Sequence, residues 1–245
     1  MTVRIILPTY EERDSIVALL AELRAQLGPA ARILVVDDSS PDGTAALVRE
    51  VAARDPGVEL LSRPRKLGLA SAYQTALRRV LDESRDDCVV TMDADFSHPP
   101  RYVPPLVAAA ATHDLVIGSR YVPGGGIDNW DGRRRLLSLA GNWYARAVTG
   151  TPVRDLTAGF TCMRTDFLRT VPFERIEARG YAWLIALKTA FHQRGARIHE
   201  LPIRFVERRF GRSKLSTNIV YESLVEPWRI RRRANPRHAA TPPPP

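Results

Sequence analysis

Cys88-Val89-Val90-Thr91-Met92-Asp93-Ala94-Asp95 joins a short apolar run to a pair of carboxylates. The apolar run predicts a buried strand, and side chains two residues apart in an extended chain share one face. Asp93 and Asp95 are therefore expected to point together toward solvent from the end of that strand. Such carboxylates suit Mg²⁺ or Mn²⁺, which usually take one or two carboxylates and fill their other positions with water and substrate phosphates. A solvated acidic turn is the alternative for an isolated Asp-x-Asp, so the surrounding sequence has to decide.

The surrounding sequence alternates short apolar runs with segments of helical periodicity. This order is typical of βα units, and it predicts an α/β fold with a Rossmann-like, mostly parallel sheet flanked by helices. The predicted strands span residues 3–7, 33–36, 58–61, 88–92 and 115–117, and the predicted helices span residues 15–27, 44–53 and 71–81.

Polar clusters follow three of the predicted strands, at residues 8–12, 37–40 and 93–95. In open sheets of this kind, ligands bind beyond the carboxyl ends of the parallel strands. The three clusters are therefore expected to converge on one crevice. Ordinary loop composition is the alternative for the first cluster, and helix capping by the turn at 39–44 is the alternative for the second.

Eight motifs follow one another along the chain. They are LPTYEE at 7–12, VVDDSSPDGT at 35–44, KLGL at 66–69, MDADFSH at 92–98, GSRY at 118–121, Arg134 with Ser138, DLTAGF at 155–160 and FVERRFGRSKL at 205–215. In this order they resemble the motifs of polyprenyl-phosphate (dolichyl-phosphate) mannose synthases, which are inverting, GT-A-fold members of glycosyltransferase family 2. The resemblance covers residues 3–216 and is far more specific than any one motif alone.

The resemblance implies a donor site, a metal site and an acceptor site. It assigns the nucleotide sugar, expected to be GDP-mannose, to Pro8, Tyr10, Glu12, Val36, Asp38, Lys66, Asp93 and Ala94. It assigns Mg²⁺ or Mn²⁺ to Asp93, Asp95 and Ser97. It assigns the phosphate of a polyprenyl lipid to Arg120, Arg134, Ser138, Arg208 and Lys214, and catalytic roles to Asp95, Arg120 and Asp155. The alternatives are solvated surface charge for the basic residues and a buried turn for Asp155.

The implied reaction is displacement at the anomeric carbon. A hydroxyl acceptor generally needs a general base, whereas a phosphomonoester, with a second pKa of about 6, is already largely an oxyanion at neutral pH. A phosphate acceptor therefore needs positioning more than deprotonation. This difference matters because Ala186 stands where the family commonly has an acidic residue. A second departure is Glu11, which replaces the usual Asn and adds negative charge beside the diphosphate site.

A net charge of +9 indicates an anionic partner or surface. Residues 200–238 contain ten Arg or Lys and four Glu, which supplies +6 of that total. We expect residues 217–238 to form a basic helix outside the core that tethers the protein to a membrane, because each basic residue near an anionic bilayer contributes about 1 kcal/mol. The alternatives are a soluble basic tail or a nucleic-acid contact, and we favour no nucleic-acid partner. A membrane-anchored partner subunit is left open.

The chain is long enough for one catalytic domain, expected at residues 1–216, with a disordered proline-rich tail at 239–245. No apolar run reaches the roughly 20 residues of a spanning helix, and the chain starts with a strand rather than a signal peptide. We therefore expect a cytoplasmic protein, peripheral on the inner face of the membrane. Cys88 and Cys162 are expected to be reduced core residues.

Other classes of function are disfavoured. The five histidines lack zinc-ligand spacing, and His98, which borders the acidic loop, is more simply interpreted as a loop cap. The glycines at 124–126 do not open a helix after a strand, which argues against a dinucleotide-binding dehydrogenase. Two alternatives remain. One is a family 2 transferase that uses another nucleotide sugar or a soluble hydroxyl acceptor. The other is a phosphoacceptor signalling receiver, whose acidic pair would follow the first strand rather than the second.

Overall fold

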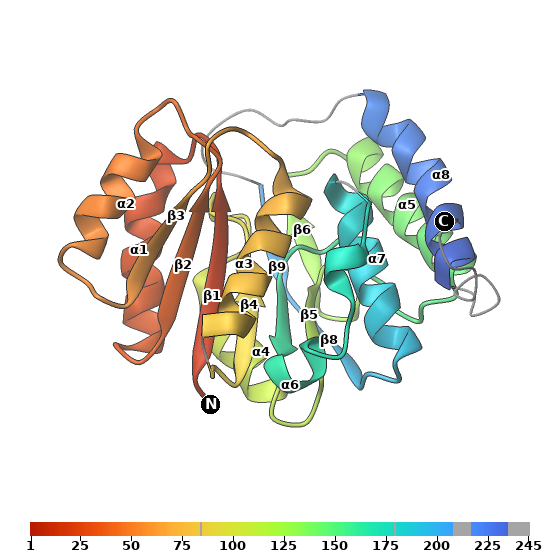
Figure 1. Ribbon diagram of the computed structural model, residues 1–245. Coiled ribbons are helices and arrows are strands. Elements are labelled where there is room, and N and C mark those ends of the chain that lie inside the picture. The colour runs from red at the N-terminus through yellow and green to blue at the C-terminus, as the bar shows by residue number, and fades with distance from the viewer. Residues whose placement is uncertain (84, 179, 208–216, 235–245) are drawn as a thin grey trace, which may run out of the picture.

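The computed structural model describes residues 1–83, 85–178, 180–207 and 217–234. A seven-stranded sheet forms the centre, with helices on both faces (Figure 1). Its spatial order is β3-β2-β1-β4-β7-β5-β8. The strands are β1 (Val3–Thr9), β2 (Arg32–Asp37), β3 (Val58–Ser62), β4 (Cys88–Thr91), β5 (Leu115–Ser119), β7 (Thr161–Arg164) and β8 (Ile198–Pro202).

The prediction of a mostly parallel sheet is confirmed. All neighbouring pairs run parallel except those of β7, which lies antiparallel between β4 and β5. The five predicted strands all form at the expected places, and β4 ends at Thr91, one residue earlier than predicted. A second, two-stranded sheet pairs β6 (Gly126–Asp128) with β9 (Arg204–Val206).

The helices bury two separate cores on the two faces of the sheet. They are α1 (Arg13–Leu27), α2 (Thr44–Ala52), α3 (Leu69–Glu83), α4 (Val103–Ala109), α5 (Gly132–Thr149), α6 (Thr165–Leu168), α7 (Gly180–Gln193) and α8 (Thr217–Ala234), with short 3-10 helices η1 (Pro100–Tyr102) and η2 (Phe173–Arg175). One core packs α1, α2 and α4, and the other packs α3, α5, α7 and α8. Successive side chains of a strand point to opposite faces of the sheet and so reach both cores. In β1, Ile5 and Leu7 face the first core and Ile6 faces the second.

The parallel strands bring four polar loops to one edge of the sheet. β1, β2, β4 and β5 run in the same direction, so their carboxyl ends lie together. The loop after each of these strands carries predicted site residues. This edge is therefore where the predicted site residues lie together.

The basic C-terminal helix packs against the body of the molecule. α8 lies along α5 and α7 (Figure 1), and Ile230 is buried in the same core as α7. The expectation that this helix lies outside the core is therefore wrong for Ile230, whose apolar side chain alternates with the arginines around it. A division at residue 216 stays a prediction, and the proline-rich tail at 239–245 lies outside the described residues. None of the described helices is long and apolar enough to cross a membrane.

Candidate active site

The acidic loop, residues 93–98, follows β4 and carries both predicted metal-binding carboxylates. The Asp93 side chain is 35% exposed, whereas Asp95 is only 3% exposed. The expectation that both carboxylates face solvent is therefore wrong for Asp95, because its Oδ1 turns back to accept a hydrogen bond from the Ser97 amide at 3.0 Å. The turn also places Phe96 in the left-handed region, with φ of 64°, which is unusual for a bulky residue and typical of functional loops.

The donor atoms of this loop fit a hard divalent cation. Ser97 Oγ is buried, and no hydrogen bond from the described part of the chain reaches it. Residues 1–83, 85–178, 180–207 and 217–234 contain no group of three or more His, Cys, Asp or Glu side chains that would hold a metal by themselves. An ion at Asp93 and Asp95 would thus draw further ligands from water and phosphate, which is how Mg²⁺ usually binds.

His98 fixes the shape of the acidic loop. Its Nδ1 accepts a hydrogen bond from the Asp93 amide at 2.9 Å, so the proton of the neutral ring sits on Nε2. The ring stacks on Phe160 with 5.0 Å between centroids. Burial lowers the pKa of His98 despite the nearby charge of Asp93, which keeps the ring neutral at neutral pH. The interpretation of His98 as a loop cap agrees with this geometry.

Tyr73 of α3 and Gly159 lie under the acidic loop. A Cβ at Gly159 would stand 3.5 Å from Asp93 Oδ1 and 3.6 Å from His98 Cε1. A methyl group at this position would therefore make ordinary van der Waals contact with both side chains. Burial and then the charge of Asp93 raise the pKa of Tyr73, so its hydroxyl stays protonated beneath the carboxylates.

The loops after β1 and β2 are joined by hydrogen bonds. Ser40 Oγ accepts from the Glu11 amide at 3.0 Å, and Thr44 Oγ1 accepts from the Glu12 amide at 3.1 Å. These contacts place Glu11 in the left-handed region, with φ of 59°. Asn tolerates this conformation better than Glu does. The departure of this chain from the family pattern at Glu11 thus carries a conformational cost.

Tyr10, Lys66 and Asp38 line the same end of the sheet. Lys66 Nζ lies 3.5 Å from the centroid of the Tyr10 ring. Asp38 is buried, and its carboxylate pairs with Arg63 and accepts from the amides of Leu67 at 3.1 Å and Gly68 at 2.9 Å. Asp38 thereby anchors the loop that carries Lys66. Arg63 is absent from the sequence-based prediction because nothing local links it to Asp38.

Three other predicted donor-site residues present little side-chain surface. Val36 is fully buried, Ala94 is 3% exposed, and Pro8 is half-buried near the end of β1. Val36 packs in the core shared with α3. A contact between Val36 and a ligand would thus have to use the main chain. Their place at the strand ends agrees with the predicted edge of the sheet.

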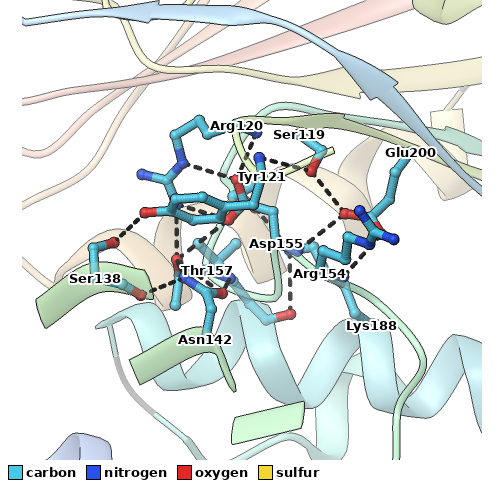
Figure 2. A network of polar contacts seen from close by, with 12 residues as sticks. Ser119, Arg120, Tyr121, Ser138, Asn142, Arg154, Asp155, Thr157, Lys188 and Glu200 are labelled. Atoms are coloured by element: carbon cyan, nitrogen blue, oxygen red, sulfur yellow. Dashed lines mark hydrogen bonds and ion pairs between the residues drawn. The ribbon is translucent and has the colours of Figure 1, made fainter. Parts of the chain in front are cut away.

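Arg120 and Asp155 form a bidentate ion pair at the end of β5 (Figure 2). Arg120 Nε donates to Asp155 Oδ2 at 2.8 Å, and Nη2 donates to Oδ1 at 2.7 Å. Asp155 is fully buried. Although burial by itself raises its pKa, the charge and hydrogen bonds of Arg120 hold the pKa of Asp155 below its ordinary value. Asp155 is therefore a fixed anion that orients Arg120.

Hydrogen bonds extend from this pair to α5. Tyr121 donates to Ser138 Oγ at 2.7 Å, and Thr157 Oγ1 accepts from Arg120 Nη2 at 2.8 Å and from Asn142 Nδ2 at 3.1 Å (Figure 2). Ser138 and Asn142 sit one helical turn apart on α5, so they meet the loop from the same face. The structure thus links Ser138 through Tyr121 to the loop of Arg120, and the role of both residues in acceptor binding stays a prediction.

Arg134 approaches the same region from the start of α5. Its Nη1 contacts Glu207 Oε1 at 2.7 Å, and its guanidinium lies 4.0 Å from the centroid of the Trp130 ring. The remaining predicted acceptor residues, Arg208 and Lys214, lie outside the described residues.

Phe205 connects the acidic loop with the basic cluster. Its ring makes an edge contact with His98, with centroids 5.5 Å apart, and Arg120 lies 5.4 Å from its centroid. His98 holds the loop of Asp93, and Arg120 belongs to the basic cluster. The predicted metal and acceptor regions therefore share one wall.

The interior behind Arg120 contains charged residues absent from the sequence-based prediction. Glu200 of β8 accepts from the Asp155 amide at 3.0 Å and from Ser119 Oγ at 2.7 Å. Lys188 of α7 is buried and donates to the Ala158 carbonyl at 2.7 Å. Ala186 is also buried, and as an alanine it supplies no carboxylate to the site. Apart from charge within an apolar helix at Lys188, the sequence offers no signal for these contacts.

Comparison with known proteins places this site in a family. Residues 4–171 match the model of glycosyl transferase family 2. An undecaprenyl-phosphate mannosyltransferase of Micrococcus luteus is 44% identical over 92% of this chain and 92% of its own length. A polyprenol monophosphomannose synthase of Mycolicibacterium smegmatis is 39% identical over 94% of this chain and 87% of its own length.

Solved structures share the fold. Mannosyl-3-phosphoglycerate synthase of Rubrobacter xylanophilus matches with a TM-score of 0.69 and 22% identity, covering 100% of this chain and 78% of its own. Glucosyl-3-phosphoglycerate synthase of Mycobacterium tuberculosis, solved with Mn²⁺, UDP-glucose and phosphoglyceric acid, matches with a TM-score of 0.66 and 22% identity, covering 94% and 79%. The predicted GT-A fold and the resemblance to polyprenyl-phosphate mannose synthases are confirmed, and the chain belongs to glycosyl transferase family 2.

Proposed function

We propose that this enzyme transfers mannose from GDP-mannose to a polyprenyl phosphate, with inversion at the anomeric carbon and with a divalent metal. The observation that carries the proposal is Arg120, locked by Asp155 beside the acidic loop and next to Ser138. Within the described part of the chain, Asp155 and Thr157 engage Nε and Nη2 of Arg120, which leaves the two N–H groups of Nη1 to donate charge-assisted hydrogen bonds to a phosphate. The names of the Micrococcus luteus and Mycolicibacterium smegmatis relatives support mannose as the sugar and a polyprenyl phosphate as the acceptor.

On the donor side, the loops after β1 and β2 hold the nucleotide. The residues that face it are Pro8, Tyr10, Glu12 and Lys66, whose loop is anchored by Asp38. The main chain at Val36 and Ala94 also contacts it. Asp93 and Asp95, with Ser97, would hold Mg²⁺ or Mn²⁺, which neutralises the charge of a departing diphosphate when bound. His98 keeps the Asp93 main chain in place. The protein thus supplies a preformed loop, at little cost in reorganisation.

On the acceptor side, Arg120, Arg134 and Ser138 position the lipid phosphate, together with Arg208 and Lys214. The phosphate attacks as an oxyanion, so positioning replaces general-base catalysis. Asp155 contributes by orienting the guanidinium of Arg120. Its lowered pKa and full engagement by Arg120 make it a poor base.

This geometry favours the lipid phosphate over the second candidate, a soluble hydroxyl acceptor. A hydroxyl nucleophile needs a base with a free lone pair close to the donor. Asp155 is bound on both oxygens, and His98 Nδ1 accepts from the loop. Ala186 supplies no carboxylate. A hydroxyl acceptor would therefore require a base from outside this constellation.

The surface of α5 supports a peripheral position on a membrane. Leu136, Leu139 and Trp143 are 67%, 47% and 71% exposed, and their spacing places them along one stripe of the helix. Trp228 of α8, 49% exposed, lies beside α5, where its Nε1 donates to the Tyr144 hydroxyl at 2.9 Å. The same two helices carry the exposed arginines Arg133, Arg135, Arg146, Arg229, Arg231, Arg232 and Arg233. An exposed apolar stripe on helices that also carry exposed arginines fits an anionic bilayer.

The same helix carries both the stripe and predicted acceptor residues. Arg134 and Ser138 on α5 are half-buried beside the network, while Leu136 and Leu139 face outward. A phosphate lying at the membrane surface would thus reach Arg120 without its lipid tail leaving the bilayer. We propose that the enzyme works at the inner face of the membrane.

The proposal is tested with a matrix of GDP- and UDP-sugars against a polyprenyl phosphate, in the presence of Mg²⁺, Mn²⁺ or EDTA. We expect GDP-mannose to give a mannosyl phospholipid, detected by mass spectrometry. Because the donor is α-linked, inversion should give a β-linked product, which NMR can verify. Unphosphorylated polyprenol is the matched control and should accept nothing. Transfer to a soluble hydroxyl compound, with none to the lipid phosphate, would establish the second candidate instead.

A further inference from the structure

Lys188 is a buried cation that the proposed mechanism leaves unused. The residue is 1% exposed, and its Nζ donates to the Ala158 carbonyl at 2.7 Å and to the Leu184 carbonyl at 3.5 Å. No carboxylate among the described residues lies within 4.0 Å of Nζ. Burying an ammonium group with only carbonyl partners is costly. A cation kept at that cost points to a role beyond packing.

Lys188 lies behind the Arg120–Asp155 pair. Figure 2 shows it rising from α7 toward the loop of Asp155. The charges that act on it are Asp155, then Arg120 at the end of β5, then Glu200 of β8. From the α3 side, Tyr73 faces α7 through its stacked contact with Trp183 at 5.7 Å and stays uncharged. Two anions and two cations therefore balance here when Lys188 is protonated.

The Ala158 carbonyl connects Lys188 with both halves of the site. Ala158 lies between Asp155, which orients Arg120, and Gly159, which lies under Asp93. The Gly159 carbonyl in turn accepts from Thr91 Oγ1 of β4 at 2.8 Å. A displacement of this loop would thus disturb both the Arg120–Asp155 pair and the surroundings of Asp93.

We propose that Lys188 is a positioning residue for the acceptor phosphate, holding the loop of Asp155 in place and offsetting the negative charge behind Arg120. The inference rests on the proposed function. Without the Lys188 charge, Asp155 and Glu200 would leave the cluster around Arg120 with a net charge of −1. An incoming phosphate would then meet a more negative potential.

This arrangement predicts pH-dependent acceptor affinity. Burial lowers the pKa of Lys188 to about 7, although Asp155 opposes the shift. As pH rises through that value the net charge of the cluster falls from 0 to −1, so affinity for a phosphate should fall. Phosphate binding favours the protonated amine and moves the midpoint upward by linkage. The folded state disfavours protonated Lys188, so removing this charge by substitution should not lower the free energy of unfolding at pH 6.5.

The experiment measures binding of farnesyl phosphate by calorimetry, without donor, at pH 6.5 and 8.5. Lys188→Met removes charge and donor, whereas Lys188→Gln keeps an N–H donor for Ala158 without charge. We expect both variants to bind about tenfold more weakly at pH 6.5, and to lose the pH dependence of the wild type. Lys188→Arg, if its melting temperature matches the wild type, should keep tight binding at pH 8.5.

Thr189→Val is the matched control, because Thr189 is equally buried on α7 and donates to or accepts from Thr151 at 2.9 Å. It should lower the melting temperature and leave farnesyl phosphate binding unchanged. Wild-type affinity and pH dependence in a folded Lys188→Met protein would overturn the role of Lys188 while leaving the proposed function intact. No binding by the wild type would instead overturn the lipid-phosphate acceptor, and the inference with it.

Discussion

Arg120 and Asp155 face each other through two parallel hydrogen bonds of 2.8 and 2.7 Å, so the carboxylate determines where the guanidinium points. A third bond, from the Arg120 amide to Asp155 Oδ2 at 3.0 Å, fixes the backbone at the end of β5 to the same group. Arg120 consequently has few rotamers to lose when a phosphate arrives. This preorganisation gives Asp155 its importance in the proposed mechanism.

Asp155→Asn should lower both stability and acceptor affinity. Removing one charge of a buried pair costs about 3–5 kcal/mol, and a chain of this size loses about 2–4 °C of melting temperature per kcal/mol. Arg120 would also lose its orientation, so the acceptor KM should rise while the donor KM changes little. Steady-state kinetics with each substrate varied in turn measure the split.

Asp114→Asn is the matched control for that experiment. Asp114 also forms a bidentate pair, with Arg197 at 2.8 and 3.0 Å, at the start of β5 rather than at its functional end. This variant should lose some stability and keep both KM values. Equal kinetic effects of the two substitutions would contradict a specific role for Asp155.

Asp95→Asn should abolish metal-dependent turnover. The amide keeps an oxygen to accept from the Ser97 amide, so the loop should persist and the melting temperature should fall by less than for Asp95→Ala. Since metal binding to carboxylates supplies several kcal/mol of charge stabilisation, kcat should fall by about 100-fold or more. Isothermal titration with Mn²⁺ and GDP provides a readout independent of turnover.

Asp95 also reveals what a local pattern leaves out. Alternation along a strand predicts that Asp93 and Asp95 share a face, and the left-handed Phe96 bends the chain just beyond them. Only Asp93 keeps substantial exposure, while Asp95 is drawn into the loop by Ser97. If Asp95→Asn retained wild-type kcat, the assignment of the metal site would be wrong.

Glu11→Asn should stabilise the protein and tighten donor binding. The left-handed φ of 59° is less strained for Asn, so the free energy of unfolding should rise by about 0.5 kcal/mol. Loss of a negative charge beside the proposed diphosphate site should lower the KM for GDP-mannose. Glu11→Gln separates the two effects, because it removes charge without favouring the left-handed conformation. A stability gain as large in Glu11→Gln as in Glu11→Asn would contradict the backbone explanation.

The sequence predicts the sheet well because apolar runs and βα alternation are local signals. Strand ends follow from these runs, and parallel strands then bring Glu12, Asp38 and Asp93 to one edge without knowledge of any contact. Contacts between distant segments are different. Glu200 lies 45 residues from Asp155, and Arg63 lies 25 residues from Asp38. No periodicity encodes such pairs, so the charges behind the site appear only in three dimensions.

β7 is absent from the predicted strands for a related reason. Its four residues, Thr161–Arg164, are too short for alternation to stand out. An antiparallel strand inserted between β4 and β5 also breaks the βα order on which the prediction depends. Its position follows from the loop of Asp155 and Gly159, which turns the chain back beside β4 through the bond from Thr91 to the Gly159 carbonyl.

Replacing the outward side chains of α5 should weaken membrane binding without unfolding the protein. Leu136 and Trp143 are 67% and 71% exposed, so Leu136→Asn with Trp143→Ser removes apolar surface that contributes little to the core. Burial is worth about 25 cal/mol per Å² of apolar area, which predicts a loss of at least tenfold in affinity for vesicles. Sedimentation with vesicles of phosphatidylglycerol and phosphatidylcholine measures it.

Charge and apolar contact can be separated in the same assay. Arg231→Gln with Arg232→Gln should weaken binding at low salt, and high salt should weaken wild-type binding in the same way, because screening removes the attraction. These substitutions are preferable to deleting the segment, since Ile230 is part of the core. Val17→Ser is the matched control, because Val17 is 42% exposed on α1, on the other face of the sheet. If the α5 variants bind vesicles as the wild type does, the acceptor must reach Arg120 by a route other than this face.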